Sequence, residues 1–115
     1  MYKIGEFSEL TGATVKTLRY YDSIGLLKPS NIDNFTNYRY YNDEELVLFK
    51  KIEYLKKLGF TLEEIKSNLS DMNIDCLDKK LDELINKRDY ITFQIKEITS
   101  LKRALKNNKI KSLIK

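Results

Sequence analysis

The sequence predicts a mainly α-helical fold, in which a winged helix-turn-helix head with a small β-hairpin precedes one long helix suited to a coiled coil. Glycine and proline occur at positions 5, 12, 25, 29 and 59 and nowhere later in the chain. Apolar residues recur at helical spacing on both sides of Gly59. We therefore expect short elements over residues 1–70, and a linker followed by one continuous helix with a basic tail over residues 71–115.

Composition excludes several classes of protein. The 115 residues suffice for one domain, and no apolar run approaches the roughly 18 residues that cross a bilayer. The first residues lack the apolar stretch of a signal peptide, and a single cysteine cannot form an internal disulfide, so a cytoplasmic protein is expected. Histidine, the commonest general base and metal ligand, is absent. We therefore expect no enzyme, no cofactor and no metal site.

Positive charge is unevenly distributed along the chain. Basic and acidic residues cancel over residues 1–70, so the net charge of +4 arises entirely after residue 70. The charged residues after Glu97 are all basic: Lys102, Arg103, Lys106, Lys109, Lys111 and Lys115. A solvated helix end explains this tail most simply. Nucleic-acid binding by the first 70 residues would need a locally basic face on a neutral module.

Two short helices are expected first, one over residues 5–10 that Gly12 closes and one that Thr14 caps and that ends near Gly25. A glycine-containing turn of about three residues between two short helices is typical of a helix-turn-helix. The inward positions are expected to be Ile4, Phe7 and Leu10 in the first helix, and Val15, Leu18 and Tyr21 or Asp22 in the second.

A hairpin and two further helices should complete the head. Pro29 blocks helix, and residues 26–41 are expected to form the hairpin, with Leu26 and Leu27 in the first strand, turn formers over 31–37 and the second strand over 38–41. Capping boxes, Asn42 with Glu45 and Thr61 with Glu64, predict one helix that ends at Gly59 and another over residues 62–69. The third helix should carry Leu46, Phe49, Ile52 and Leu55 at helical spacing.

The last helix should start near Asp75 and carry an apolar seam, interrupted at Arg88 and Lys102. The seam comprises Leu77, Leu81, Leu84, Ile91, Ile95, Ile98 and Leu105. About 30 helical residues would extend roughly 45 Å, which is more than a 70-residue head can cover. An identical chain is the simplest partner, so the seam predicts a homodimer.

The outward face of the second helix predicts DNA binding. Lys16, Thr17 and Tyr20 would face the major groove, and Arg19 would reach a backbone phosphate. Arg39, among tyrosines on the wing, would reach phosphate or the minor groove. Lys56 and Lys57 would add phosphate contacts from the end of the third helix. Tyr21 and Tyr40 are expected in the core rather than at the DNA, and Arg19 has the alternative of an i, i+3 ion pair with Asp22.

Several motifs occur in order over residues 2–70. They are Ile4-Gly5-Glu6-Phe7, Thr17-Leu18-Arg19-Tyr20-Tyr21-Asp22, Ile24-Gly25-Leu26-Leu27, Pro29, Tyr38-Arg39-Tyr40-Tyr41 and Leu58-Gly59-Phe60-Thr61-Leu62-Glu63-Glu64-Ile65. With these motifs the chain resembles the MerR family of transcription regulators. The resemblance implies a winged helix-turn-helix head, an antiparallel coiled-coil dimer, and a promoter with an overlong spacer that is distorted for RNA polymerase.

The resemblance also implies which residues contact DNA. They are Thr14, Lys16, Arg19 and Tyr20 on the recognition helix, Tyr38 and Arg39 on the wing, and Lys56 as a phosphate contact. Asn37 stands where the family usually has glycine, and asparagine also tolerates positive φ. Cys76 matches roughly the cysteine that mercury sensors place at the start of the dimer helix. Without further soft ligands we expect a structural role for it.

Two other classes of protein share part of this pattern. An architectural DNA-bending protein, such as an excisionase-like recombination accessory factor, would have the winged head, but small accessory factors rarely carry so long a helix. A coiled-coil interaction module without DNA binding would leave the outward Lys16, Arg19 and Arg39 unexplained. The leading hypothesis is therefore a homodimeric, sequence-specific transcription regulator.

Overall fold

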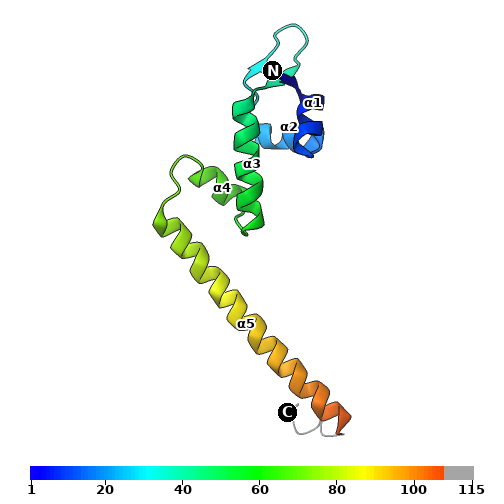
Figure 1. The fold of residues 1–115 in the computed structure, drawn as a ribbon, viewed down its shortest axis with the longest axis vertical. Helices are drawn as coiled ribbons and strands as arrows, with labels where there is room; N and C mark the ends of the chain where they lie inside the picture. The colour runs from blue at the N-terminus through cyan, green and yellow to red at the C-terminus, as the bar shows by residue number, and fades with distance from the viewer. Residues whose placement is uncertain (108–115) are drawn as a thin grey trace. The chain divides into compact units, whose positions relative to one another are not determined.

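The computed structural model describes residues 1–107, which form two compact units divided between Met72 and Asn73. The first unit holds four helices, α1 (Ile4–Thr11), α2 (Val15–Ser23), α3 (Asp43–Lys57) and α4 (Leu62–Asn68), with a small sheet. The second unit is the helix α5 (Ile74–Lys106). The predicted mainly α fold, with its winged head and long final helix, is confirmed (Figure 1). Across residues 1–107, no helix is both long enough and apolar enough to cross a membrane.

The sheet has three antiparallel strands in the order β1-β3-β2. These are β1 (Tyr2–Lys3), β2 (Asn31–Ile32) and β3 (Arg39–Tyr41). The hairpin of β2 and β3 is the predicted wing, with Ile32 opposite Arg39. β1 pairs with the other edge of β3, with Tyr2 opposite Tyr41. β1 was not expected, because two residues are too short to show an alternating pattern.

The prediction that Leu26 and Leu27 enter the first strand is wrong. Both backbone N–H groups donate to the carbonyl of Tyr21, at 2.9 and 3.2 Å, so these residues close the end of α2. Both side chains are buried in the core of the head. The strand begins only at Asn31, beyond Pro29, and the turn is shortened to the residues between Ile32 and Arg39.

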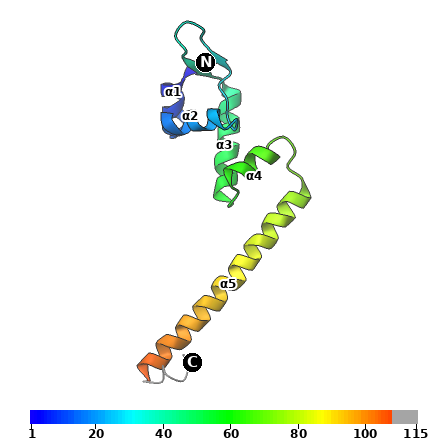
Figure 2. The ribbon, with the colours of Figure 1, turned by 180° about the vertical axis from the view of Figure 1, so that it is seen from behind.

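The core of the head forms where α1, α2, α3 and the sheet meet, and both views show α4 lying against α3 (Figures 1 and 2). The ring of Phe7 stacks on Tyr41 with 4.3 Å between centroids and meets Phe49 edge-on at 6.4 Å. Leu10, expected to face inward beside Phe7, is 53% exposed. The two-turn α1 packs through Phe7, and Leu10 only borders a shallow groove beside Tyr54 of α3.

The predicted caps are confirmed. The Thr14 hydroxyl accepts a hydrogen bond from the N–H of Thr17, and the Thr61 hydroxyl accepts one from the N–H of Glu64. Glu45 accepts from the N–H of Asn42 at 3.3 Å and also from the hydroxyl of Ser30, which ties the start of the wing to α3. Gly12 closes α1 with φ +79°, a conformation that side chains disfavour.

Tyr41 presents a test of the core packing. Its hydroxyl is buried and has no hydrogen-bond partner among residues 1–107, and burial raises its pKa above the ordinary value. Because a phenyl ring leaves no buried polar atom unpaired, Tyr41→Phe should leave stability unchanged or raise it by up to about 1 kcal/mol. Urea unfolding of the pure protein measures this change.

Tyr21→Phe is the matched control. The Tyr21 hydroxyl accepts from Lys56 Nζ at 3.1 Å and lies 3.4 Å from Glu53 Oε1, so its removal should cost about 1 kcal/mol. A loss of stability in Tyr41→Phe as large as that in Tyr21→Phe would contradict the assignment of an unpaired Tyr41 hydroxyl.

The helix α5 is capped at its start by Asn73, whose side chain accepts from the N–H of Cys76 at 3.0 Å. The predicted seam lies along it, and in the single chain every seam residue from Leu77 to Leu105 is between 40% and 65% exposed. Lys102, Arg103 and Lys106 of the predicted basic tail lie in its last turns. Lys109, Lys111 and Lys115 lie outside the described residues.

Candidate nucleic-acid interface

The helix α2 presents a polar and aromatic face to solvent. Leu18 and Tyr21 are buried, which turns Lys16, Arg19 and Tyr20 outward, with Tyr20 53% exposed. Thr14 and Thr17 lie at the start of the helix, and the Thr14 hydroxyl donates to that of Thr17 at 2.9 Å. The two threonines therefore hold the first turn, next to the exposed Lys16.

The wing turn is organised by one carboxylate. Asp33 Oδ1 accepts from the N–H groups of Phe35 and Thr36 at 2.8 and 3.0 Å, and the Asp33 N–H donates to the carbonyl of Tyr38 at 3.0 Å. Asn37 has φ +60°, so the expected positive φ at this position is confirmed. The turn holds the side chain of Phe35 99% exposed. Sequence reasoning did not single out Phe35, since no pattern distinguishes it from a buried phenylalanine.

Acid should loosen this turn. The backbone hydrogen bonds from Thr36 and Phe35 lower the pKa of Asp33 below its usual 3.8. A lowered pKa in the folded state means that the carboxylate stabilises the turn above the unfolded-state pKa and that this stabilisation is lost as pH falls through the folded-state value. The amide protons of Phe35 and Thr36 should therefore lose their hydrogen-bonded NMR shifts only at a pH below 3.8. In Asp33→Ala these shifts should lack the transition; an identical transition in both proteins would contradict the assignment.

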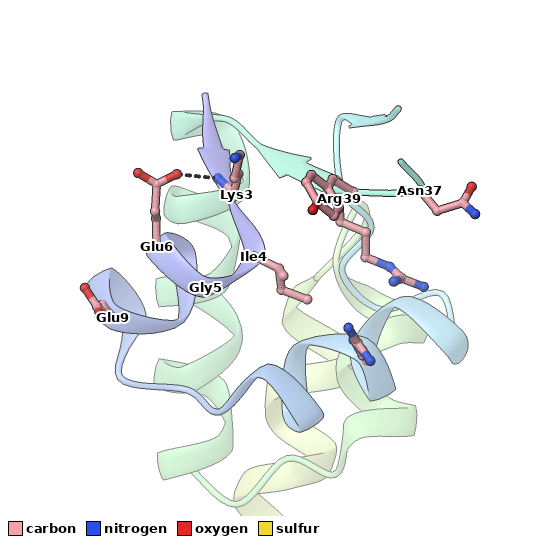
Figure 3. Close-up of a pocket in the computed structure, with 9 residues that line it drawn as sticks. Lys3, Ile4, Gly5, Glu6, Glu9, Asn37 and Arg39 are labelled. Carbon is pink, nitrogen blue, oxygen red and sulfur yellow. Dashed lines mark hydrogen bonds between the residues drawn. The ribbon is translucent and has the colours of Figure 1, made fainter. Parts of the chain in front are cut away.

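A groove of about 510 Å³ joins the wing, the start of α1 and α2. Figure 3 shows Lys3, Ile4 and Glu6 along one side and Asn37 and Arg39 on the other. The remaining lining residues are Gly5, Glu9, Arg19 and Tyr38. Three of the predicted DNA-contact residues, Arg19, Tyr38 and Arg39, therefore meet at one groove.

Charges of both signs line this groove. Lys3 Nζ lies 5.3 Å from the centre of the Tyr38 ring, a cation–π contact that adds a third positive charge beside Arg19 and Arg39. Glu6 accepts a hydrogen bond from the N–H of Lys3 at 2.8 Å and so helps to cap α1. Lys3 was missed because a lone lysine before the first helix carries no motif.

An ion pair connects the wing to α2. Arg39 Nε lies 3.0 Å from Asp22 Oδ2, and the two side chains are 31% and 17% exposed. The suggested pair between Arg19 and Asp22 is therefore wrong: the strand β3 brings Arg39 to Asp22 across 17 residues of sequence. Sequence spacing could only suggest the local i, i+3 partner.

The side chain of Lys56, a predicted phosphate contact, interacts with other side chains of the head. Its Nζ donates to the Tyr21 hydroxyl at 3.1 Å and lies 3.4 Å from Glu53 Oε1. The hydrogen bond with Tyr21 is the main cause that raises the pKa of Lys56, so the amine stays charged. The expected core position is confirmed for Tyr21 but not for Tyr40, which is only half-buried, and Tyr41 takes the core position instead.

Metal-ligating side chains do not converge within residues 1–107, where no three His, Cys, Asp or Glu residues are grouped to hold an ion. Cys76 is half-buried in the first turn of α5 as an unpaired thiol. The site on α2 and the wing is therefore made of cationic, aromatic and hydroxyl side chains. Such side chains suit a polyanion with stacked bases.

Comparison with known proteins assigns the family. Residues 2–72 match the model of the MerR HTH family regulatory protein. The chain belongs to the MerR family. Residues 2–72 therefore form the DNA-binding module of a family of transcription regulators.

Two curated relatives from Bacillus subtilis (strain 168) show how far the similarity extends. The Multidrug-efflux transporter 1 regulator is 49% identical over 65 residues, which are 56% of this chain and 23% of that protein. The uncharacterized HTH-type transcriptional regulator YyaN is 31% identical over 112 residues, covering 91% of this chain and 80% of YyaN. The MerR-family chain thus matches about a quarter of the first relative and most of the second.

Two solved structures share the fold. The EcmrR–DNA complex in EcmrR-RPo, solved by cryo-EM, matches 93% of this chain and 41% of that one, with TM-score 0.80 and 32% identity. The crystal structure of MtaN, the N-terminus of the Bacillus subtilis multidrug transporter activator, matches 91% of this chain and 98% of that one, with TM-score 0.76 and 30% identity. The likeness therefore extends beyond the head of the MerR-family chain.

Proposed function

We propose that the protein binds a two-fold symmetric promoter site as a homodimer and distorts the DNA to control transcription. The observation that carries this proposal is the meeting of the outward face of α2 with the wing at one groove lined by Arg19, Tyr38 and Arg39. EcmrR, whose matching chain is seen on DNA in an RNA polymerase open complex, supports promoter DNA and polymerase as partners. The named relatives favour transcription regulation over an architectural role in recombination.

The proposed contacts divide by chemistry. Lys16 reads a base edge in the major groove, while Arg19 and Arg39 neutralise phosphates. Tyr20 and Tyr38 are each about half exposed and donate their hydroxyls to the backbone. Thr14 and Thr17 position the first turn of α2 and present their hydroxyls to the adjacent phosphate. Lys56 has three N–H donors, of which Tyr21 and Glu53 take two, so one remains for a phosphate.

The proposed dimer uses the seam of α5. With Ile74 before it and the interrupting Arg88 and Lys102 counted, the seam runs over residues 74–105 in alternating steps of three and four, which assigns coiled-coil positions a and d to every member. In an antiparallel pair an a residue faces a d residue of the other chain. One register aligns residues 74–105 of the two chains end to end: Ile74 faces Leu105 of the partner subunit, Leu81 faces Ile98 of the partner subunit, and Leu84 faces Ile95 of the partner subunit. In this register the interruptions fall opposite apolar residues, with Lys102 facing Leu77 of the partner subunit and Arg88 facing Ile91 of the partner subunit.

The charges of α5 favour the same orientation. Acidic residues gather near its start, at Asp75, Asp78, Asp82 and Glu83. Its last turns carry Lys102, Arg103 and Lys106 and no acid. An antiparallel pair places each basic end beside the acidic end of the partner subunit, whereas a parallel pair places like charges together.

The single cysteine allows a direct measurement of this arrangement. In the proposed register the two Cys76 residues are separated along the axis by 27 residues of helix rise, which is about 40 Å. A spin label on Cys76 of the otherwise unchanged protein should therefore give an intra-dimer distance near 40 Å. A parallel pair would bring the labels within about 20 Å, and that result would exclude the antiparallel register.

DNA binding is tested by titration of a fluorescent mixed-sequence duplex at several salt concentrations. The logarithm of affinity should fall linearly with the logarithm of salt concentration, since each contacted phosphate releases counterions. Bending of a selected site, measured by the gel mobility of circularly permuted duplexes, should appear only when protein is bound. An affinity independent of salt would contradict the proposed phosphate contacts.

A further inference from the structure

The Asp22–Arg39 ion pair uses only one edge of the guanidinium. Nε of Arg39 donates to Asp22 Oδ2 at 3.0 Å, and among residues 1–107 no other group hydrogen-bonds the two terminal nitrogens. An arginine has five N–H donors in a fixed planar fork. With Nε fixed by the carboxylate, the terminal N–H groups remain available to an external acceptor.

The pair also fixes where Arg39 reaches. In Figure 3 the side chain of Arg39 extends from β3 toward α2, which carries Asp22 at its C-terminal end. The Asp22 side chain is 17% exposed, so it is less free to turn into solvent than the side chain of a fully exposed acid. A guanidinium tied to α2 cannot swing independently of the recognition helix. The ion pair therefore holds the proposed phosphate contact, Arg39, in a fixed position relative to the base-reading face of α2.

We propose that Asp22 is a positioning residue for DNA binding: it orients the terminal N–H groups of Arg39 toward a backbone phosphate in register with α2. This inference rests on the proposed function, in which Arg39 contacts phosphate. The cost of immobilising the arginine is met in the free protein, so less conformational entropy is lost on binding. Asp22 thus strengthens the binding of a polyanion although it is itself an anion.

The direction of the change in DNA affinity on removal of Asp22 distinguishes this positioning role from a general charge effect. Electrostatics alone predicts that removal of any acid near DNA tightens binding. If Asp22 orients Arg39, Asp22→Ala should instead weaken binding by about three- to tenfold at fixed salt, the entropic cost of ordering one free arginine side chain. Asp22→Asn keeps an oxygen that can accept from Nε, and should recover part of this loss.

Two comparisons isolate the effect. In the Arg39→Ala background there is no guanidinium to orient, so adding Asp22→Ala should leave affinity unchanged or raise it. Glu9→Ala is the matched acid control: Glu9 lines the same groove, and within residues 1–107 its carboxylate has no hydrogen bond or ion pair. Its removal should tighten binding. All variants are titrated with the mixed-sequence duplex, and thermal melting of each confirms that it is folded.

NMR of the free protein gives a readout that does not depend on DNA. The Nε–H signal of Arg39 should be protected from exchange in the wild type and lose protection in Asp22→Ala. Tighter binding by Asp22→Ala in the wild-type background, or an unprotected Nε–H in the wild type, would overturn the inference while leaving the proposed function intact. Failure of the wild type to bind any duplex would overturn the proposed function itself. Wild-type affinity in Arg39→Ala would overturn both the inference and the phosphate role of Arg39.

Discussion

Ile95→Asp should dissociate the dimer. Ile95 is 62% exposed in the single chain and faces Leu84 of the partner subunit in the proposed register. Each dimer would bury two aspartates against leucine with no partner for their charge, at a cost of about 3–5 kcal/mol or more. The dissociation constant should therefore rise by more than roughly a hundredfold. Sedimentation equilibrium at micromolar protein measures the change.

Phe93→Asp is the matched control for this prediction. Phe93 is similarly exposed, 55%, but its position lies opposite the seam, where its ring stacks beside Tyr90 with 6.3 Å between centroids. The same apolar-to-acid change there should leave the dimer intact. Dissociation of Phe93→Asp together with a stable Ile95→Asp dimer would place the interface on the other face of α5.

Arg39→Ala and Lys16→Ala should affect DNA binding in different ways. Arg39 is proposed to contact phosphate, so its loss should weaken binding to all sequences and reduce the salt slope by about one. Lys16 is proposed to read a base edge, so its loss should cost about 1–3 kcal/mol on the selected site and relax the preference at one position. Titration of both variants against selected and mixed-sequence duplexes separates the two effects.

Lys50→Ala controls for net charge in this experiment. Lys50 is exposed on α3 and lines the groove beside Leu10, which is lined by none of the residues proposed above to contact DNA. Its removal changes the charge of the head by the same amount as Lys16→Ala. Equal losses for Lys50→Ala and Lys16→Ala would indicate a diffuse electrostatic effect and would contradict base reading by Lys16.

Local signals in the sequence predicted most of the fold. Caps at Thr14, Asn42 and Thr61 act within three residues of chain, and each marks a helix start that the structure shows. The long seam was visible because its repeat persists over some thirty residues, far beyond chance spacing. Element type and order could therefore be predicted from short-range chemistry alone.

Long-range contacts were the part that sequence could not reveal. The pairing of β1 with β3 joins Tyr2 to Tyr41, and the ion pair joins Asp22 to Arg39; neither leaves a trace in local spacing. Arg39 was recognised as a candidate contact, but its orientation depends on an acid that local rules assigned to Arg19. The residue types of the site were predictable, whereas the groove that gathers them required the tertiary fold.

Selection of bound duplexes from a random-sequence library tests the central claim most directly. A homodimer with two recognition helices related by two-fold symmetry should enrich sites with an inverted repeat, whose half-sites change preference when Lys16 is replaced by alanine. Enrichment of a dyad by the wild-type protein is the result that we predict. Recovery of sequences without a dyad, or no enrichment over the starting library, would contradict the claim that the protein is a sequence-specific, two-fold symmetric DNA-binding regulator.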